Sequence, residues 1–169
     1  MGKLRVLRRC GCMMVLAGLA LAVPGMLEGG QPPPNWKATV TGQAVAGSIV
    51  IEGGRPVRLD TDTLGGNSSH LGKFTATGSH KLYLDDFTFA GEATYVAANG
   101  DKLFVTYEGY LFPGDDPDYP FAFLADITAQ GGTGRLRNAA GNGIMSGAFN
   151  GVSLAYYFSI DGTLSPNGK

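Results

Sequence analysis

Residues 131–151, GGTGRLRNAAGNGIMSGAFNG, directly follow the alternating run of residues 121–130, FAFLADITAQ. Seven of these 21 residues are glycine, which accepts positive φ and allows close approach of two backbones. Apolar runs stand on both sides of this stretch, so it is typical of a tight corner between two strands. The sequence therefore predicts an all-β protein, closed or nearly closed into a barrel.

The rest of the chain supports an all-β fold. From residue 37 onward, Val, Thr, Tyr and Phe are interrupted by Gly, Asn and Asp at short intervals, and no window shows a helical apolar period. Ten short segments are candidate strands: 37–46, 48–52, 57–60, 72–77, 81–84, 87–97, 102–112, 121–130, 144–149 and 152–164. Short strands joined by tight turns fit a barrel or a sandwich with little helix.

The first residues have the pattern of a secretory signal peptide. A basic head with Lys3, Arg5, Arg8 and Arg9 precedes an apolar run over 10–22, which ends in Ala-Leu-Ala. The run is too short for a transmembrane anchor. We expect a signal peptide over 1–22, with cleavage there or a few residues later, a Gly/Pro-rich linker over 23–36, one barrel domain over 37–165 and a tail over 166–169. The protein is then secreted or periplasmic, without a stable membrane anchor after processing.

Removal of this leader changes both the cysteine content and the charge. The two cysteines, Cys10 and Cys12, lie in the leader, so the mature chain would have no disulfide and no thiolate nucleophile. The whole chain has 13 basic and 14 acidic residues, and four of the basic residues are in the leader. The mature chain is therefore acidic, which argues against nucleic acid and anionic membranes as partners.

Three short motifs resemble a known superfamily. Residues 131–141, GGTGRLRNAAG, look like the glycine-rich corner of dirigent and allene oxide cyclase proteins. They also resemble small exported bacterial proteins, as do residues 69–75, SHLGKFT, and 97–101, AANGD. This resemblance implies a calycin-like antiparallel barrel of about eight strands around a central cavity, often trimeric in plant members. Ala140 stands where plant dirigents usually have arginine, and Leu136 replaces the usual Phe, so dirigent activity is not implied.

No complete catalytic or cofactor motif occurs in the chain. The spacings of a P-loop, a dinucleotide-binding loop and a Gly-x-Ser-x-Gly nucleophile elbow are all absent, so we expect no cofactor. Aromatic side chains are abundant; they either fill the barrel or, in part, line a cavity. The residues that we select as candidates for ligand binding are His70, Tyr83, Asp85, Tyr107, Asp126 and Arg137.

Metal binding is a weaker interpretation. His70 and His80 are evenly spaced and could share one strand face, but no acidic or cysteine ligand stands at a typical distance from them. Two acidic clusters, Asp60 with Asp62 and Asp115 with Asp116 and Asp118, could gather Ca²⁺, although neither completes an EF-hand series. The favoured interpretation is that both acidic clusters belong to solvated loops, and we expect no metal.

Three functions remain open at this level. The first is a non-catalytic exported barrel that binds a small apolar or aromatic ligand. The second is a cofactor-independent isomerase or cyclase, or a dirigent-like protein, that acts on a small hydrophobic substrate. The shape of the barrel cavity would then hold the substrate in the reactive geometry. The third is an envelope-associated structural module, for example a homotrimer that assembles through the outer wall of the barrel.

Overall fold

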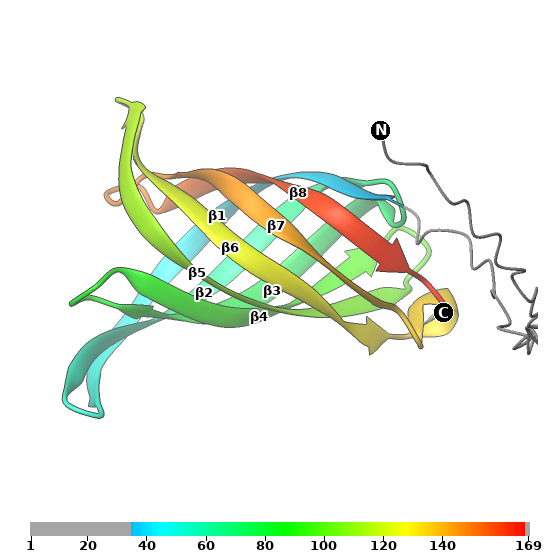
Figure 1. The fold of residues 1–169 in the computed structure, drawn as a ribbon, viewed down its shortest axis with the longest axis horizontal. Helices are drawn as coiled ribbons and strands as arrows, with labels where there is room; N and C mark the ends of the chain where they lie inside the picture. The colour runs from blue at the N-terminus through cyan, green and yellow to red at the C-terminus, as the bar shows by residue number, and fades with distance from the viewer. Residues whose placement is uncertain (1–34, 168–169) are drawn as a thin grey trace, which may run out of the picture. The chain divides into compact units, whose positions relative to one another are not determined.

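The computed structural model describes residues 35–167 and confirms an all-β fold. Eight antiparallel strands pair in chain order, and β8 pairs with β1 to close the ring (Figure 1). The strands are β1 (Asn35–Glu52), β2 (Arg55–Ser68), β3 (Gly72–Tyr83), β4 (Thr88–Ala97), β5 (Lys102–Asp116), β6 (Tyr119–Gly132), β7 (Ala140–Phe149) and β8 (Ala155–Ser165). Within residues 35–167, no helix has the length and apolar character needed to cross a membrane.

The strands are fewer and longer than the ten predicted segments. Segments 37–46 and 48–52 belong to one strand, β1, whose register with β2 shifts between Ala46 and Ile49. Segments 72–77 and 81–84 likewise form the single strand β3. The predicted signal peptide lies outside the described residues, as do residues 23–34 of the linker and residues 168–169 of the tail.

The glycine-rich corner lies between β6 and β7, where it forms a short 3-10 helix, η1 (Gly134–Leu136). Gly134 has a φ of +57°, and a Cβ there would overlap the carboxylate of Asp101 in the turn between β4 and β5. The N–H of Lys102 donates to Thr133 Oγ1 at 2.9 Å, which joins the same two turns. Glycine is favoured here because it accepts the positive φ and leaves room for the Asp101 side chain.

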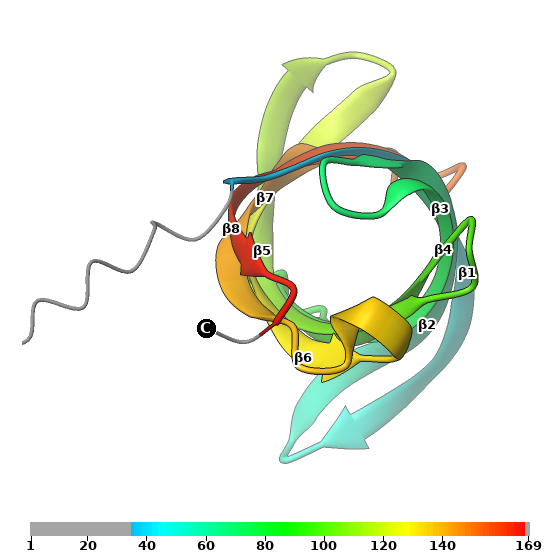
Figure 2. The same cartoon turned by 90° about the vertical axis from the view of Figure 1, so that its right-hand side faces the viewer.

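This corner helps to close one end of the barrel, which also holds the start of β1 and the end of β8. Figure 2 views the ring from that end, with η1 lying over part of it. The interior of this half is filled by fully buried apolar side chains, including Trp36, Leu103, Leu136 and Leu164. A side chain of this kind contributes about 1.5–3 kcal/mol when it moves from water into a packed core. The closed half therefore supplies much of the hydrophobic stabilisation.

The opposite end of the barrel is open. It carries the hairpin turns β1–β2, β3–β4, β5–β6 and β7–β8, and two of these hairpins project as long arms on opposite sides of the ring (Figures 1 and 2). Inward-facing side chains of β5 become more exposed toward this end. Val105 is buried, whereas Tyr107 and Leu111 are half-buried. The interior thus changes from a packed core into a cavity that opens between the hairpins.

Candidate ligand-binding site

A cavity of about 70 Å³ occupies the open half of the barrel interior. One water molecule needs only about 10–15 Å³ of space measured in this way, so the cavity can hold a small organic molecule. Its wall is formed by Ala44, Arg58, Asp62, Leu64, His80, Leu82, Phe89, Ala93, Tyr95, Tyr107, Leu111, Phe123, Met145, Phe149, Tyr156 and Phe158. Most of this wall is aromatic or aliphatic, and its Arg, Asp and His side chains come from β2 and β3.

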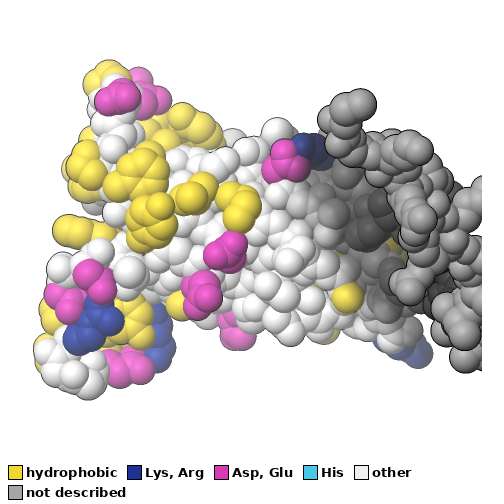
Figure 3. Space-filling model, in the orientation of Figure 1, with side chains coloured by type: hydrophobic (Ala, Val, Ile, Leu, Met, Phe, Trp, Pro, Cys, Tyr) yellow, Lys and Arg dark blue, Asp and Glu magenta, His cyan; other side chains and the backbone are white. Residues whose placement is uncertain are grey.

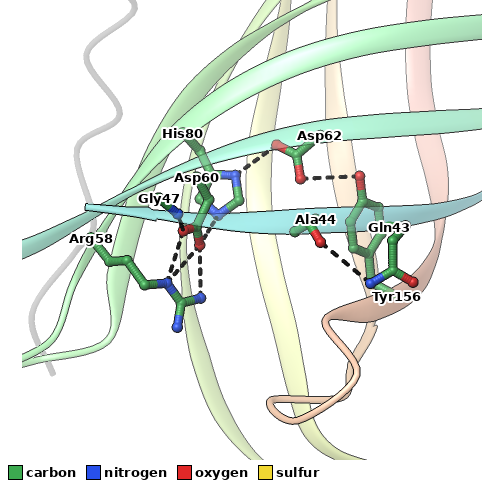
Figure 4. Close-up of polar contacts among 8 residues, drawn as sticks. All are labelled: Gln43, Ala44, Gly47, Arg58, Asp60, Asp62, His80 and Tyr156. Atoms are coloured by element: carbon green, nitrogen blue, oxygen red, sulfur yellow. Dashed lines mark hydrogen bonds and ion pairs between the residues drawn. The ribbon is translucent and has the colours of Figure 1, made fainter. Parts of the chain in front are cut away.

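Strand periodicity places the ionisable side chains together. Arg58, Asp60 and Asp62 alternate along β2, so all three point to the same face of the sheet, which is the interior. His80 lies directly opposite Asp60 on the neighbouring strand β3. We call these four residues the ionic cluster; Figure 4 shows how their side chains converge.

Asp60 is the buried centre of the ionic cluster. Its side chain is fully buried, and its Oδ2 accepts hydrogen bonds from Arg58 Nε at 2.8 Å and from Arg58 Nη2 at 2.7 Å. Its Oδ1 accepts the N–H of Gly47 at 3.2 Å. Burial alone would raise the pKa of Asp60, but hydrogen bonds from His80 and Arg58 outweigh burial and hold this pKa at about 2. Asp60 is therefore a carboxylate throughout the physiological pH range.

His80 lies between two carboxylates. Its Nδ1 donates to Asp62 Oδ2 at 2.7 Å, and its Nε2 is 3.4 Å from Asp60 Oδ2. Burial alone would lower the pKa of His80, but hydrogen bonds to Asp60 and Asp62 raise it to about 9. The imidazole is therefore protonated at neutral pH. The two cations, Arg58 and His80, then balance the two carboxylates, and the ionic cluster has no net charge.

Tyrosine hydroxyls extend the ionic cluster across the barrel. Tyr156, on β8, donates its hydroxyl to Asp62 Oδ1 at 3.3 Å. Burial, and next the negative charge of Asp62, raise the pKa of both Tyr107 and Tyr156 above the ordinary range. Both are therefore neutral phenols, which can donate and accept hydrogen bonds. A Cβ at Gly42 would overlap the ring of Tyr156, so glycine at that position leaves the space for this side chain.

The ionic cluster presents three of its four residues to the cavity. Arg58, Asp62 and His80 belong to the cavity wall, whereas Asp60 lies behind them and is enclosed by its own partners. A carboxylate has about four acceptor sites, and the contacts from His80 and Tyr156 occupy two of those on Asp62. The site therefore offers a ligand one partly occupied acceptor on Asp62, the paired cations of Arg58 and His80, neutral phenols and a large apolar wall.

Of the six residues selected from the sequence, the structure places only Tyr107 in the cavity wall. His70 is near the closed end, where its Nε2 is 3.0 Å from the carbonyl oxygen of Asn35. Arg137 is exposed beside η1, and Asp126 is exposed on the outer face of β6. The structure does not bring these three residues together.

Tyr83 and Asp85 belong to a surface contact near the tip of the β1–β2 arm. The guanidinium of Arg55 stacks over the ring of Tyr83 at 4.2 Å from its centroid. The same guanidinium donates to both oxygens of the Asp85 carboxylate at 2.8 Å. These contacts hold the arm against the turn between β3 and β4, outside the cavity.

The proposed metal ligands are dispersed or engaged in local contacts. His70 and His80 lie near opposite ends of β3. Asp115, Asp116 and Asp118 surround the turn between β5 and β6, where Asp116 Oδ1 accepts the N–H of Asp118 at 2.9 Å. Among residues 35–167, no group of three or more His, Cys, Asp or Glu side chains is arranged as a metal site.

Comparison of the chain with protein-family models, curated proteins and solved structures finds no match. The structure defines the protein as a closed eight-stranded antiparallel barrel with one packed end and one hollow end.

Proposed function

We propose that this protein is an exported binding protein that holds one small, uncharged and mostly apolar ligand in the open half of its barrel. The observation that carries the proposal is the cavity wall, which is aromatic and aliphatic except for a few convergent polar groups. Small-molecule sites commonly combine a concave apolar surface with a few fixed polar groups in this way. The basic head and apolar run of residues 1–22 support export. The corner at residues 131–141 resembles that of a superfamily whose barrels have a central cavity.

The charge balance of the ionic cluster favours an uncharged ligand. A carboxylate ligand would face Asp62, which carries the same charge, and would find Arg58 already paired with Asp60 at 2.7 Å. An ammonium ligand would find the charge of Asp62 already paired with protonated His80 at 2.7 Å. Moving an unpaired ion from water into such a site costs several kcal/mol. A neutral hydroxyl or carbonyl group avoids this penalty and can still bond to Asp62 or to a tyrosine hydroxyl.

Four ligands of nearly equal size test this proposal. Toluene, benzyl alcohol, benzoate and benzylammonium share one ring and differ in charge and hydrogen-bonding capacity. In calorimetric titrations, we expect the two neutral compounds to bind and the two ions to bind at least about tenfold more weakly. No heat with either neutral compound, together with no mass shift in native mass spectrometry, would show that the barrel does not bind this class of ligand.

Two substitutions on the same strand provide the structural control. Ala93, on β4, is buried in the cavity wall, whereas Ala90 on the same strand is exposed on the outer surface. We expect Ala93→Leu to weaken benzyl alcohol binding at least about tenfold because the added side chain fills cavity space, and Ala90→Leu to leave binding unchanged. Equal affinities of the two variants would place the ligand outside the cavity.

A cofactor-independent isomerase is the second candidate. The specific observation in its favour is a carboxylate, Asp62, beside the hydroxyl of Tyr156 in the wall of an apolar cavity. Asp62 would accept a proton from the carbon next to a ligand carbonyl, and a tyrosine would donate to the developing enolate oxygen. Return of the proton to another carbon completes an isomerisation without any redox change.

Exchange of carbon-bound hydrogen for deuterium tests this second candidate. In D₂O, cyclohexanone incubated with the protein should incorporate deuterium next to its carbonyl, and Asp62→Asn should slow this exchange at least about 100-fold. Asp126→Asn, on the outer wall, serves as the control and should exchange at the wild-type rate. Exchange no faster than in buffer would remove the catalytic candidate and leave the binding proposal intact.

A further inference from the structure

The distal part of β1 has hydrogen-bonding strand neighbours on one side only. β8 pairs with β1 from Asn35 to Gln43, and the last contact beyond this ladder is the N–H of Ala44 donating to the carbonyl of Leu154 at 2.9 Å. β2 continues along the other side of β1 as far as Glu52. Within the described chain, residues 45–52 thus form a strand edge without a neighbouring strand, which we call the arm edge. Figure 2 shows this hairpin projecting away from the ring.

The arm edge carries large apolar side chains on both of its faces. The exposed fractions are 61% for Ile49, 38% for Val50 and 71% for Ile51. Alternation along the strand puts Ile49 and Ile51 on one face and Val50 on the other. Figure 3 shows that hydrophobic side chains gather at the hairpin end of the barrel, while few are visible on the wall toward the closed end. Monomeric proteins seldom leave apolar surface of this kind uncovered.

Beyond its register shift, the arm edge lacks the usual protection against strand pairing. Exposed edges are commonly blocked by lysine, proline, an inward-pointing charge or a β-bulge. Residues 45–51, VAGSIVI, contain no lysine, proline or charge, the register shift ends at Ile49, and the first charged residue is Glu52. The carboxylate of Glu52 is paired with Lys81 Nζ at 2.8 Å, so its charge is largely neutralised. The arm edge is therefore suited to accept another strand.

A lipid surface would cover the apolar side chains but would leave the backbone N–H and C=O groups of the edge without partners. A second strand satisfies both requirements, because it hydrogen-bonds to the edge and packs its own side chains beside Ile49 and Ile51. The occupant is therefore a polypeptide strand.

We propose that the arm edge pairs antiparallel with the arm edge of a second copy of this chain, so that two barrels form a two-fold symmetric dimer. With the axis at Val50, each Ile49 lies opposite Ile51 of the other copy, and each Glu52 lies opposite Ser48. No like charges meet in this register, whereas parallel pairing in register would place Glu52 against Glu52. A two-fold axis makes one surface complementary to itself, which is the commonest symmetry of soluble oligomers.

This dimer differs from a trimer built through the barrel wall, because only the projecting hairpins are in contact. It does not depend on the proposed ligand. The contact is small, so we expect a reversible dimer at the low end of the usual range of interface size.

A single cysteine tests the register directly. The chain's two cysteines, Cys10 and Cys12, are first replaced by serine in the full chain, and Val50→Cys is then introduced. Opposed residues of an antiparallel pair have Cα atoms about 4.5–5.5 Å apart, which is within the range of a disulfide. Mild oxidation should convert most of this variant to a disulfide-linked dimer. The control is Ile144→Cys on the barrel wall, which is similarly exposed at 42% and should stay monomeric.

Sedimentation velocity on the chain without added cysteine provides the second measurement. We expect a concentration-dependent equilibrium between monomer and dimer, and a dimer dissociation constant at least about tenfold higher for Ile49→Lys, because each lysine then replaces an apolar side chain opposite Ile51 of the other copy. Circular dichroism and benzyl alcohol binding should not change in this variant. A monomer at every concentration, a trimer, or equal cross-linking of the two cysteine variants would each overturn the proposal.

Discussion

Replacement of Asp60 by alanine is expected to lower the free energy of unfolding by about 3–5 kcal/mol, because it leaves buried charges without their partner. Asp60 is fully buried and binds Arg58 through two guanidinium nitrogens. It also faces His80, whose side chain is only 18% exposed. Neither cation reaches bulk water easily from its position in the barrel. The loss therefore exceeds that expected from an ion pair on the surface, which is at most about 1 kcal/mol.

Urea unfolding followed by far-ultraviolet circular dichroism measures this effect. Asp60→Asn keeps the size of the side chain but removes its charge, so it should lose nearly as much stability as Asp60→Ala. Asp126→Asn makes the same chemical change on the exposed outer face of β6 and should stay within about 0.5 kcal/mol of the wild type. A loss below about 1 kcal/mol for Asp60→Ala would mean that Arg58 and His80 are not held as buried cations.

The position of the ionic cluster bears on its role. Breaking a buried ionic group is costly, yet well-packed apolar side chains of similar volume are commonly as stabilising as the intact group. The closed half of this barrel is filled in that apolar way, with Trp36, Leu103 and Leu164 completely buried. The fold therefore does not require charges inside the barrel. Their restriction to the hollow half, in contact with the cavity, supports a role in ligand recognition.

The barrel could be predicted from the sequence because its signals are local. Alternation marks the strands, and glycines mark the corner at residues 131–141, where Gly134 has a positive φ. The expected count of about eight strands is confirmed, but the residue pattern alone divided the chain into ten segments, because the register shift between Ala46 and Ile49 makes one long strand resemble two short ones. Residues of the kind that mark turns elsewhere in the chain mark, in β1, only an irregularity of pairing within one continuous strand.

The ionic cluster was harder to predict because strand register decides which face points inward. In the stretch 57–64, VRLDTDTL, the usual assumption is that apolar side chains face the interior. On that assumption, Leu59 would point toward the core and Asp60 and Asp62 would point toward water. The structure does the reverse: Leu59 is exposed and both aspartates are buried. A shift of one residue exchanges the two faces of a strand, so the pairing of Asp60 with His80 on β3 had to be known. His70 and Arg137 were selected from motifs that form turns at the closed end, away from the cavity.

The ionic cluster should also make stability depend on pH in a defined direction. The pKa of His80 rises from its ordinary value of 6.5 to about 9 on folding, so the folded protein binds this proton more tightly than the unfolded chain does. The resulting stabilisation is fully present below pH 6.5 and is lost as the pH rises through 9. A shift of this size corresponds to about 3 kcal/mol. For Asp60, whose pKa falls from 3.8 to about 2, the stabilisation is present above pH 3.8 and is lost as the pH falls through 2.

We therefore expect maximal stability between these limits, with a fall of about 3 kcal/mol from pH 6.5 to pH 9 and above in urea unfolding experiments. His80→Gln removes the titrating group, so this variant should be less stable than the wild type near neutral pH but should show no loss over the same range. Proton NMR of the imidazole provides an independent measurement, with an expected titration midpoint near 9. His70 lies outside the cluster and gives a second imidazole signal for comparison within the same protein. A wild-type stability that stays constant up to pH 9, or an equal loss in His80→Gln, would show that His80 does not carry its proton between Asp60 and Asp62.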